Sequence, residues 1–136
     1  MSRVLVVEDE RGSATALGIY LKHIGHEARV LTDARDALRV ARSFQPDIVV
    51  CDWVLGRGFD GLELARAVHA LRPAIRFVLM TGMPGLALDQ RLAKTPVDHV
   101  LCKPVSLGEL GSVVGALAAG RPRPTSEGTR RVGGPG

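Results

Sequence analysis

The sequence predicts an open α/β sheet in which parallel strands alternate with helices. Five apolar runs have the length of strands, at residues 4–7, 28–31, 48–51, 77–80 and 97–101, of which the second is the weakest. Runs that are apolar on both sides of the pleat are typical of parallel strands covered on both faces. A helical pattern follows each run, and this alternation indicates βα units with right-handed crossovers.

The helical segments are identified by apolar residues at helical spacing, and they cover about residues 14–24, 34–41, 62–71, 86–93 and 106–119. Gly25 closes the first segment and Pro73 follows the third, and both residues are typical stop signals. The last segment begins at Ser106, with Glu109 three residues later. This spacing is the signature of a capping box, so we expect a helix in spite of the glycines that follow.

Length and composition indicate one globular domain. The chain has 136 residues, of which 46% are hydrophobic, and this length suffices for a core. No apolar run approaches the roughly 18 residues that a membrane helix needs. Acidic residues stand where a signal peptide would have its cleavage site. We therefore expect a cytoplasmic protein with no membrane partner.

The net charge of +4 belongs mostly to the C-terminal tail. From Gly120 onward, four arginines stand against one glutamate, whereas residues 1–119 hold 14 basic and 13 acidic residues. The tail is rich in proline and glycine and cannot bury enough apolar surface to fold alone. The sequence thus predicts a domain at residues 1–119, a disordered tail at residues 120–136, and no direct binding of nucleic acid.

Polar side chains follow four of the five predicted strands. Glu8 and Asp9 end the first strand, Asp52 the third, Thr81 the fourth and Lys103 the fifth. Ligands bind at the carboxyl ends of strands in folds of this class. Each residue alone has a simpler explanation, as a helix cap or a solvated loop residue. Together, three carboxylates would repel one another without a cation, and oxygen donors favour a hard ion such as Mg²⁺.

The motifs at these strand ends resemble those of a known family. V-L-V-V-E-D-E, V-V-C-D-W-V-L followed by D-G-L-E-L, L-M-T-G and L-C-K-P-V occur in register over residues 3–119. This pattern is similar to the receiver domain of bacterial two-component response regulators. The resemblance implies a flavodoxin-like, doubly wound sheet with strand order 2-1-3-4-5 and five helices. It also implies a phosphoprotein that switches partner binding, and not a turnover enzyme.

The resemblance assigns a role to each polar residue. Asp52 would accept a phosphoryl group from a histidine kinase or a histidine phosphotransfer protein, Thr81 would bond that group, and Lys103 would pair with it. Oxygen atoms of four residues would hold Mg²⁺: Glu8, Asp9, Asp52 and, through its backbone carbonyl, Val54. Mg²⁺ and Lys103 would offset the repulsion between a carboxylate nucleophile and an anionic donor. Lys103-Pro104 is a candidate cis peptide bond that would aim the ammonium inward.

The chain departs from the family pattern at two places. Gly56 stands where the family usually has proline, and the loop that it begins has one extra residue before the Asp-Gly pair. Val100 stands at the family's aromatic switch position, beside His99, which we expect on an exposed strand end without a function. A stiff β-branched side chain cannot swing as an aromatic ring does.

The residues at these and neighbouring positions affect two expectations: how the signal reaches a partner, and how long the phosphoryl group stays on Asp52. We expect the signal to pass through the backbone of residues 82–85 to a partner surface near residues 83–93, with the fifth strand and the last helix beside it. Val54 and Met83 are apolar at the two positions that flank the attacking water in receivers. The phosphoryl group should therefore be lost slowly.

Two other classes of function stay open at this point. A phosphohydrolase or nucleotide enzyme could use a similar sheet, but the chain lacks a G-x-x-x-x-G-K-[ST] loop, and Val54 stands where a second aspartate would be needed. A receiver-like scaffold could bind partners without phosphorylation. We expect a stand-alone receiver, because no output domain follows residue 119.

Overall fold

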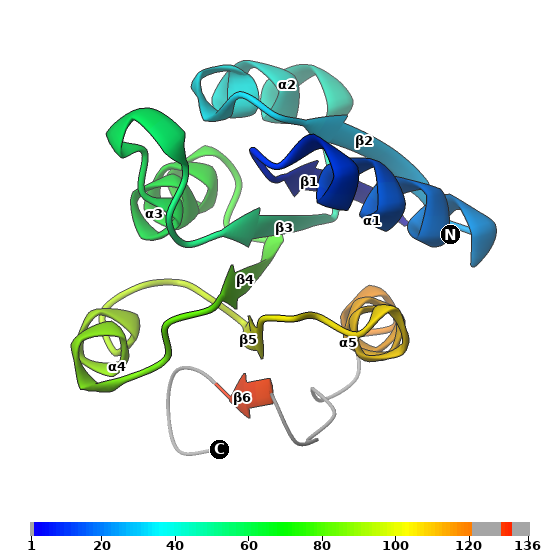
Figure 1. Cartoon of the computed structure of the whole chain (residues 1–136). Coiled ribbons are helices and arrows are strands. Elements are labelled where there is room, and N and C mark those ends of the chain that lie inside the picture. The colour runs from blue at the N-terminus through cyan, green and yellow to red at the C-terminus, as the bar shows by residue number, and fades with distance from the viewer. Residues whose placement is uncertain (1, 121–128, 132–136) are drawn as a thin grey trace.

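The computed structural model describes residues 2–120 and the backbone of residues 129–131. Five parallel strands form the sheet: β1 (Arg3–Val7), β2 (Glu27–Leu31), β3 (Ile48–Asp52), β4 (Arg76–Thr81) and β5 (His99–Cys102). Their order is β2-β1-β3-β4-β5, as the family resemblance implied (Figure 1). The register pairs Val7 with Cys51 and Asp52 with Met80, so the carboxyl ends of the central strands lie at one edge.

Five helices connect the strands: α1 (Arg11–His23), α2 (Ala37–Phe44), α3 (Gly61–Leu71), α4 (Leu86–Leu92) and α5 (Leu107–Ala118). A 3₁₀ turn at Ala34–Asp36 precedes α2, with Asp33 as its cap. The Oγ atom of Ser106 accepts a hydrogen bond from the Glu109 N–H at 3.3 Å, which confirms the predicted start of α5. The chain forms a second 3₁₀ turn, Gly56–Gly58, where the loop after Asp52 carries its extra residue.

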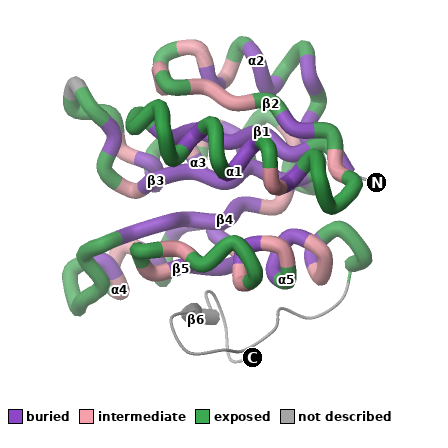
Figure 2. Tube along the Cα trace, turned by 45° about the vertical axis from the view of Figure 1, so that its right-hand side comes forward, coloured by how far each residue is buried: buried purple, intermediate pink, exposed green. Residues whose placement is uncertain are grey.

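The helices form one layer on each face of the sheet. Side chains of α1 and α5 pack in one core cluster, and side chains of α2, α3 and α4 pack in the other. Figure 2 shows that buried positions follow the central strands, while exposed positions lie on the outer sides of the helices. All five residues of β3 are buried, including Asp52 at its end. Close packing on both faces therefore makes the sheet a rigid support for the polar residues at its edge.

Two expectations about the region around β5 were wrong. His99 is the first residue of β5 and lies on the same face as Leu101, but it is 1% exposed, so this strand end is buried and not exposed. Part of the tail forms a further strand, β6 (Thr129–Arg131), which pairs antiparallel with β5. An edge strand offers unpaired N–H and C=O groups that such a segment can bond. The rest of the predicted disordered tail, apart from Gly120, lies outside the described residues.

Among the described residues, no helix has both the length and the apolar character needed to cross a membrane.

Candidate functional site

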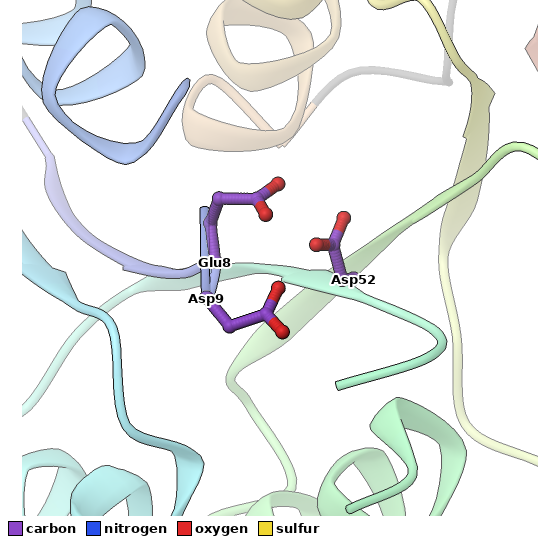
Figure 3. A group of neighbouring side chains, drawn as sticks. All are labelled: Glu8, Asp9 and Asp52. Carbon is purple, nitrogen blue, oxygen red and sulfur yellow. The ribbon is translucent and has the colours of Figure 1, made fainter. Parts of the chain in front are cut away.

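The carboxylates predicted from the sequence converge at the carboxyl end of the sheet. One oxygen atom from each of Glu8, Asp9 and Asp52 lies within 4.8 Å of the others. Figure 3 shows the side chain of Glu8 and that of Asp9, both just after β1, directed toward Asp52 at the end of β3. Glu8 is 1% exposed and Asp52 is 3% exposed, whereas Asp9 is open to solvent. The site is thus half enclosed, with access past Asp9.

Lys103 supplies the positive charge that faces these carboxylates. Its Nζ atom lies 2.7 Å from Oδ1 of Asp52 and 3.2 Å from Oε2 of Glu8. The Lys103–Pro104 peptide bond is cis, as the sequence predicted. The backbone N–H of Lys103 donates to the carbonyl of Thr81 at 2.7 Å, so β4 and β5 are joined beside the site.

Three carboxylates face the single ammonium group of Lys103, which cannot neutralise all of their negative charge. Burial, helped by the neighbouring Glu8, raises the pKa of Asp52 to about 7, although Lys103 opposes the change. Burial alone would raise the pKa of Glu8, but hydrogen bonds with Asp52, the Glu10 N–H and Lys103 lower it below its usual range. Asp52 therefore stays partly protonated near neutral pH. A divalent cation would replace that proton, and the oxygen-only donor set fits Mg²⁺.

A tightly packed loop follows Asp52. The Gly61 N–H donates to the Trp53 carbonyl at 2.7 Å, and a Cβ on Gly61 would overlap the carbonyl oxygen of Asp52. Val54 forms an isolated bridge with Asp60, whose side chain caps α3 and pairs with Arg91 of α4 at 2.7 Å. The predicted role of the Val54 carbonyl stays a prediction, but its loop is joined to α4 by this ion pair.

Thr81 is buried at the end of β4, and its hydroxyl is tied to the next loop. Its Oγ1 atom accepts a hydrogen bond from the Met83 N–H at 2.9 Å. The hydroxyl proton of Thr81 can still be donated, because Oγ1 acts only as an acceptor in this bond; its predicted bond to a phosphoryl group stays a prediction. Any shift of Thr81 toward that group would alter the contact with Met83.

Sequence reasoning missed two residues that shape the site. Glu10 caps α1 by accepting from the Gly12 and Ser13 N–H groups, and its own N–H donates to Oε1 of Glu8 at 3.1 Å. The Gly56 N–H donates to Oδ2 of Asp9 at 3.0 Å. Glutamate is a less common cap than serine or aspartate, so the role of Glu10 was difficult to predict from the sequence. Gly56 could be singled out from the sequence, because it stands where the family usually has proline, and proline has no N–H to donate.

Comparison with known families agrees with this geometry. The family model described as "Response regulator receiver domain" matches residues 4–115, which is most of the chain. The chain belongs to the response regulator receiver domain family. Receiver domains act in two-component signalling, where histidine kinases or phosphotransfer proteins phosphorylate them, and they bind Mg²⁺ at an acidic pocket.

Individual receiver proteins show the same relationship. The DNA-binding transcriptional regulator NtrC of Azospirillum brasilense is 32% identical over 111 residues, which cover 82% of this chain and 23% of NtrC. Response regulator MprA of Mycolicibacterium vanbaalenii is 30% identical over 115 residues, which cover 85% of this chain and 49% of MprA. The chain thus spans about a quarter of the length of NtrC and about half that of MprA, and the expected stand-alone state stays a prediction.

Solved receiver structures confirm the fold. The Francisella response regulator 1452 receiver domain superposes with a TM-score of 0.79 at 23% identity, over 88% of this chain and 98% of that chain. Vibrio cholerae CheY4, a chemotaxis protein, superposes with a TM-score of 0.79 at 21% identity, over 86% of this chain and 98% of that chain.

Proposed function

We propose that Asp52 accepts a phosphoryl group from a phosphohistidine in a Mg²⁺-dependent reaction, and that the resulting aspartyl phosphate changes partner binding. The observation that carries this proposal is the setting of Asp52. It is a buried carboxylate, 2.7 Å from the Lys103 ammonium and within reach of two further carboxylates. Such a charge has no structural use that would offset its burial.

In the proposed reaction, an oxygen of ionised Asp52 forms a bond to phosphorus while the bond from phosphorus to the donor imidazole nitrogen breaks. The donor nitrogen keeps the electron pair and is later protonated from solvent. Oxygen atoms of four residues would hold Mg²⁺, which would supply charge neutralisation for the transferring group: Glu8, Asp9, Asp52 and, through its backbone carbonyl, Val54. Lys103 turns from Asp52 toward the new phosphoryl oxygens, and the Thr81 hydroxyl donates to one of them.

A hollow beside the site is suited to a protein donor. A cavity of about 330 Å³ lies between α1 and the start of α5, next to Lys103. Its apolar lining comes from six residues: Ala16, Leu17, Met80, Pro104, Val105 and Leu107. An apolar side chain of a kinase or phosphotransfer protein could bury surface there, while its histidine reaches Asp52.

The output is proposed to run through the β4–α4 loop. Val100 is fully buried and β-branched, which supports a switch without a swinging aromatic ring. The contact between Thr81 and the Met83 N–H links the site to this loop. Met83 is 60% exposed and Leu86 is 72% exposed, so the loop and the start of α4 offer apolar surface. We place the partner surface at residues 83–93, with β5 and α5 beside it.

The proposal is tested by incubation with acetyl phosphate and Mg²⁺, followed by intact-protein mass spectrometry. We expect a gain of about 80 Da, the mass of one phosphoryl group, that is lost in Asp52→Asn. Glu63→Gln is the matched control, because Glu63 is an exposed carboxylate on α3 that is not part of the Glu8, Asp9 and Asp52 cluster. No gain in mass for the wild type would favour the alternative, a scaffold that works without phosphorylation. A gain that persists in Asp52→Asn would move the phosphoacceptor elsewhere.

A further inference from the structure

Asp9 differs from the other two carboxylates in what holds it in place. Glu8 and Asp52 are buried and paired with Lys103, whereas Asp9 is exposed. Its Oδ2 atom accepts a hydrogen bond from the Gly56 N–H at 3.0 Å, across 47 residues of sequence. An exposed carboxylate without such a bond would sample several rotamers. The bond to Gly56 therefore accounts for the direction of Asp9 toward Asp52 in Figure 3.

The loop that presents this N–H is itself anchored. Leu55 is buried in the core, and its N–H donates to the Phe59 carbonyl at 3.0 Å. The Gly56 carbonyl accepts from the Phe59 N–H, which closes the 3₁₀ turn. The donor is thus held before any ligand binds, so little freedom is lost when Asp9 is oriented.

Glycine gives position 56 two properties that proline would remove. Proline has no N–H to donate. A Cβ at position 56 would also lie 3.2 Å from Oδ2 of Asp9, which leaves little space for a larger residue. The backbone itself would accept proline, because Leu55 is extended (φ −110°, ψ 153°) and Gly56 is the first residue of the turn.

We propose that the Gly56 backbone N–H is a positioning group that orients Asp9 as a Mg²⁺ ligand. This inference rests on the Mg²⁺-dependent function proposed above. The extra residue in the loop and the glycine at its start would then act together: the loop reaches Asp9, and the N–H fixes it. This hydrogen bond is a feature of the loop in this chain, because the family usually has proline at the position of Gly56.

The test is a Mg²⁺ titration of the unphosphorylated protein. Trp53 is the only tryptophan in the chain and directly follows Asp52, so its fluorescence can report cation binding. Gly56→Pro should weaken Mg²⁺ affinity about tenfold, the change expected when a hydrogen bond to a charged group is lost. Gly56→Ala keeps the N–H and should stay within about threefold of the wild type.

A second pair of variants separates positioning from a general effect on the loop. In an Asp9→Ala background, Gly56→Pro should cause no further loss of Mg²⁺ affinity, because the group on which it acts is gone. Urea unfolding in EDTA should show Gly56→Pro to be at most about 1–2 kcal/mol less stable than the wild type, because the hydrogen bond to Asp9 is lost while proline restricts the unfolded chain.

Each other outcome would overturn the inference in a distinct way. Equal affinities for Gly56→Pro and the wild type would show that the N–H has no role. Equal losses for Gly56→Pro and Gly56→Ala would assign the effect to space and not to the N–H. A further loss in the Asp9→Ala background would show that the loop acts through another ligand. No Mg²⁺ binding by the wild type would overturn the proposed function together with this inference.

Discussion

Replacing Asp52 with asparagine should stabilise the protein above about pH 7 when no divalent cation is present. Burial holds the pKa of Asp52 at about 7 in the folded chain, against 3.8 for an ordinary aspartate. The folded state therefore keeps this proton after the unfolded state has lost it. The contribution of Asp52 to the free energy of unfolding is therefore most favourable below about pH 4, falls as the pH rises to about 7, and is then constant.

The size of the effect follows from the shift. One pKa unit corresponds to about 1.4 kcal/mol, so a shift of roughly three units costs about 4 kcal/mol once Asp52 is ionised. Asparagine has a similar shape and does not ionise, but Lys103 then loses one of its two partners. We expect Asp52→Asn to be more stable than the wild type by about 2–4 kcal/mol at about pH 8.5, and nearly equal at about pH 4.

Urea unfolding followed by Trp53 fluorescence in EDTA measures this difference. Glu63→Gln serves as the control, since it removes an exposed carboxylate and should change little at either pH. Added Mg²⁺ should narrow the gap, because it stabilises the ionised wild type alone. An Asp52→Asn variant that unfolds at lower urea than the wild type at about pH 8.5, or a gap independent of pH, would refute the reasoning.

Three further predictions concern the loops around the site. Gly61→Ala should lower the free energy of unfolding in urea by more than about 2 kcal/mol, because the added Cβ would overlap the Asp52 carbonyl. Gly115→Ala is the control for this measurement, because a Cβ at position 115 would meet no atom within 4 Å. Val54→Asn should shorten the lifetime of the aspartyl phosphate, measured by loss of the mass adduct over time, because an amide can hydrogen-bond the attacking water. Beryllofluoride, a phosphoryl mimic, should change amide hydrogen exchange at residues 82–94.

Each of these has an outcome that would contradict it. A Gly61→Ala protein as stable as Gly115→Ala would show that the Asp52 backbone can move aside. A wild-type aspartyl phosphate lost within seconds, or a Val54→Asn lifetime no shorter than that of the wild type, would remove the proposed role of the apolar flank. Exchange changes confined to α1 would move the output surface away from α4.

The sequence predicted the sheet and the polar residues at its edge because both leave strong local signals. Apolar runs of strand length located β1 and β3 to within one residue at each end. Asp52 and Lys103 were identified as candidate site residues because a charged side chain directly after a buried strand is costly unless it is paired or binds a ligand. The cis bond before Pro104 was predicted from the residue pair and the motif around it.

The features that were missed depend on contacts between distant segments. His99 falls inside the apolar run predicted at residues 97–101, but its complete burial depends on the packing of β5 within the sheet. The pairing of Thr129–Arg131 with β5 depends on an available strand edge, which composition does not reveal. The bond from Gly56 to Asp9 joins two loops, and only the missing proline hinted at it.

The most direct test of the central claim is the location of the acyl phosphate. Borohydride reduces an aspartyl phosphate to homoserine, and peptide mass spectrometry of the reduced, phosphorylated protein reports the position of that residue. We predict homoserine at position 52 and unmodified side chains at Glu8 and Asp9, only when Mg²⁺ was present. Homoserine at another position, or an adduct that survives borohydride and stays on a histidine, would contradict the account.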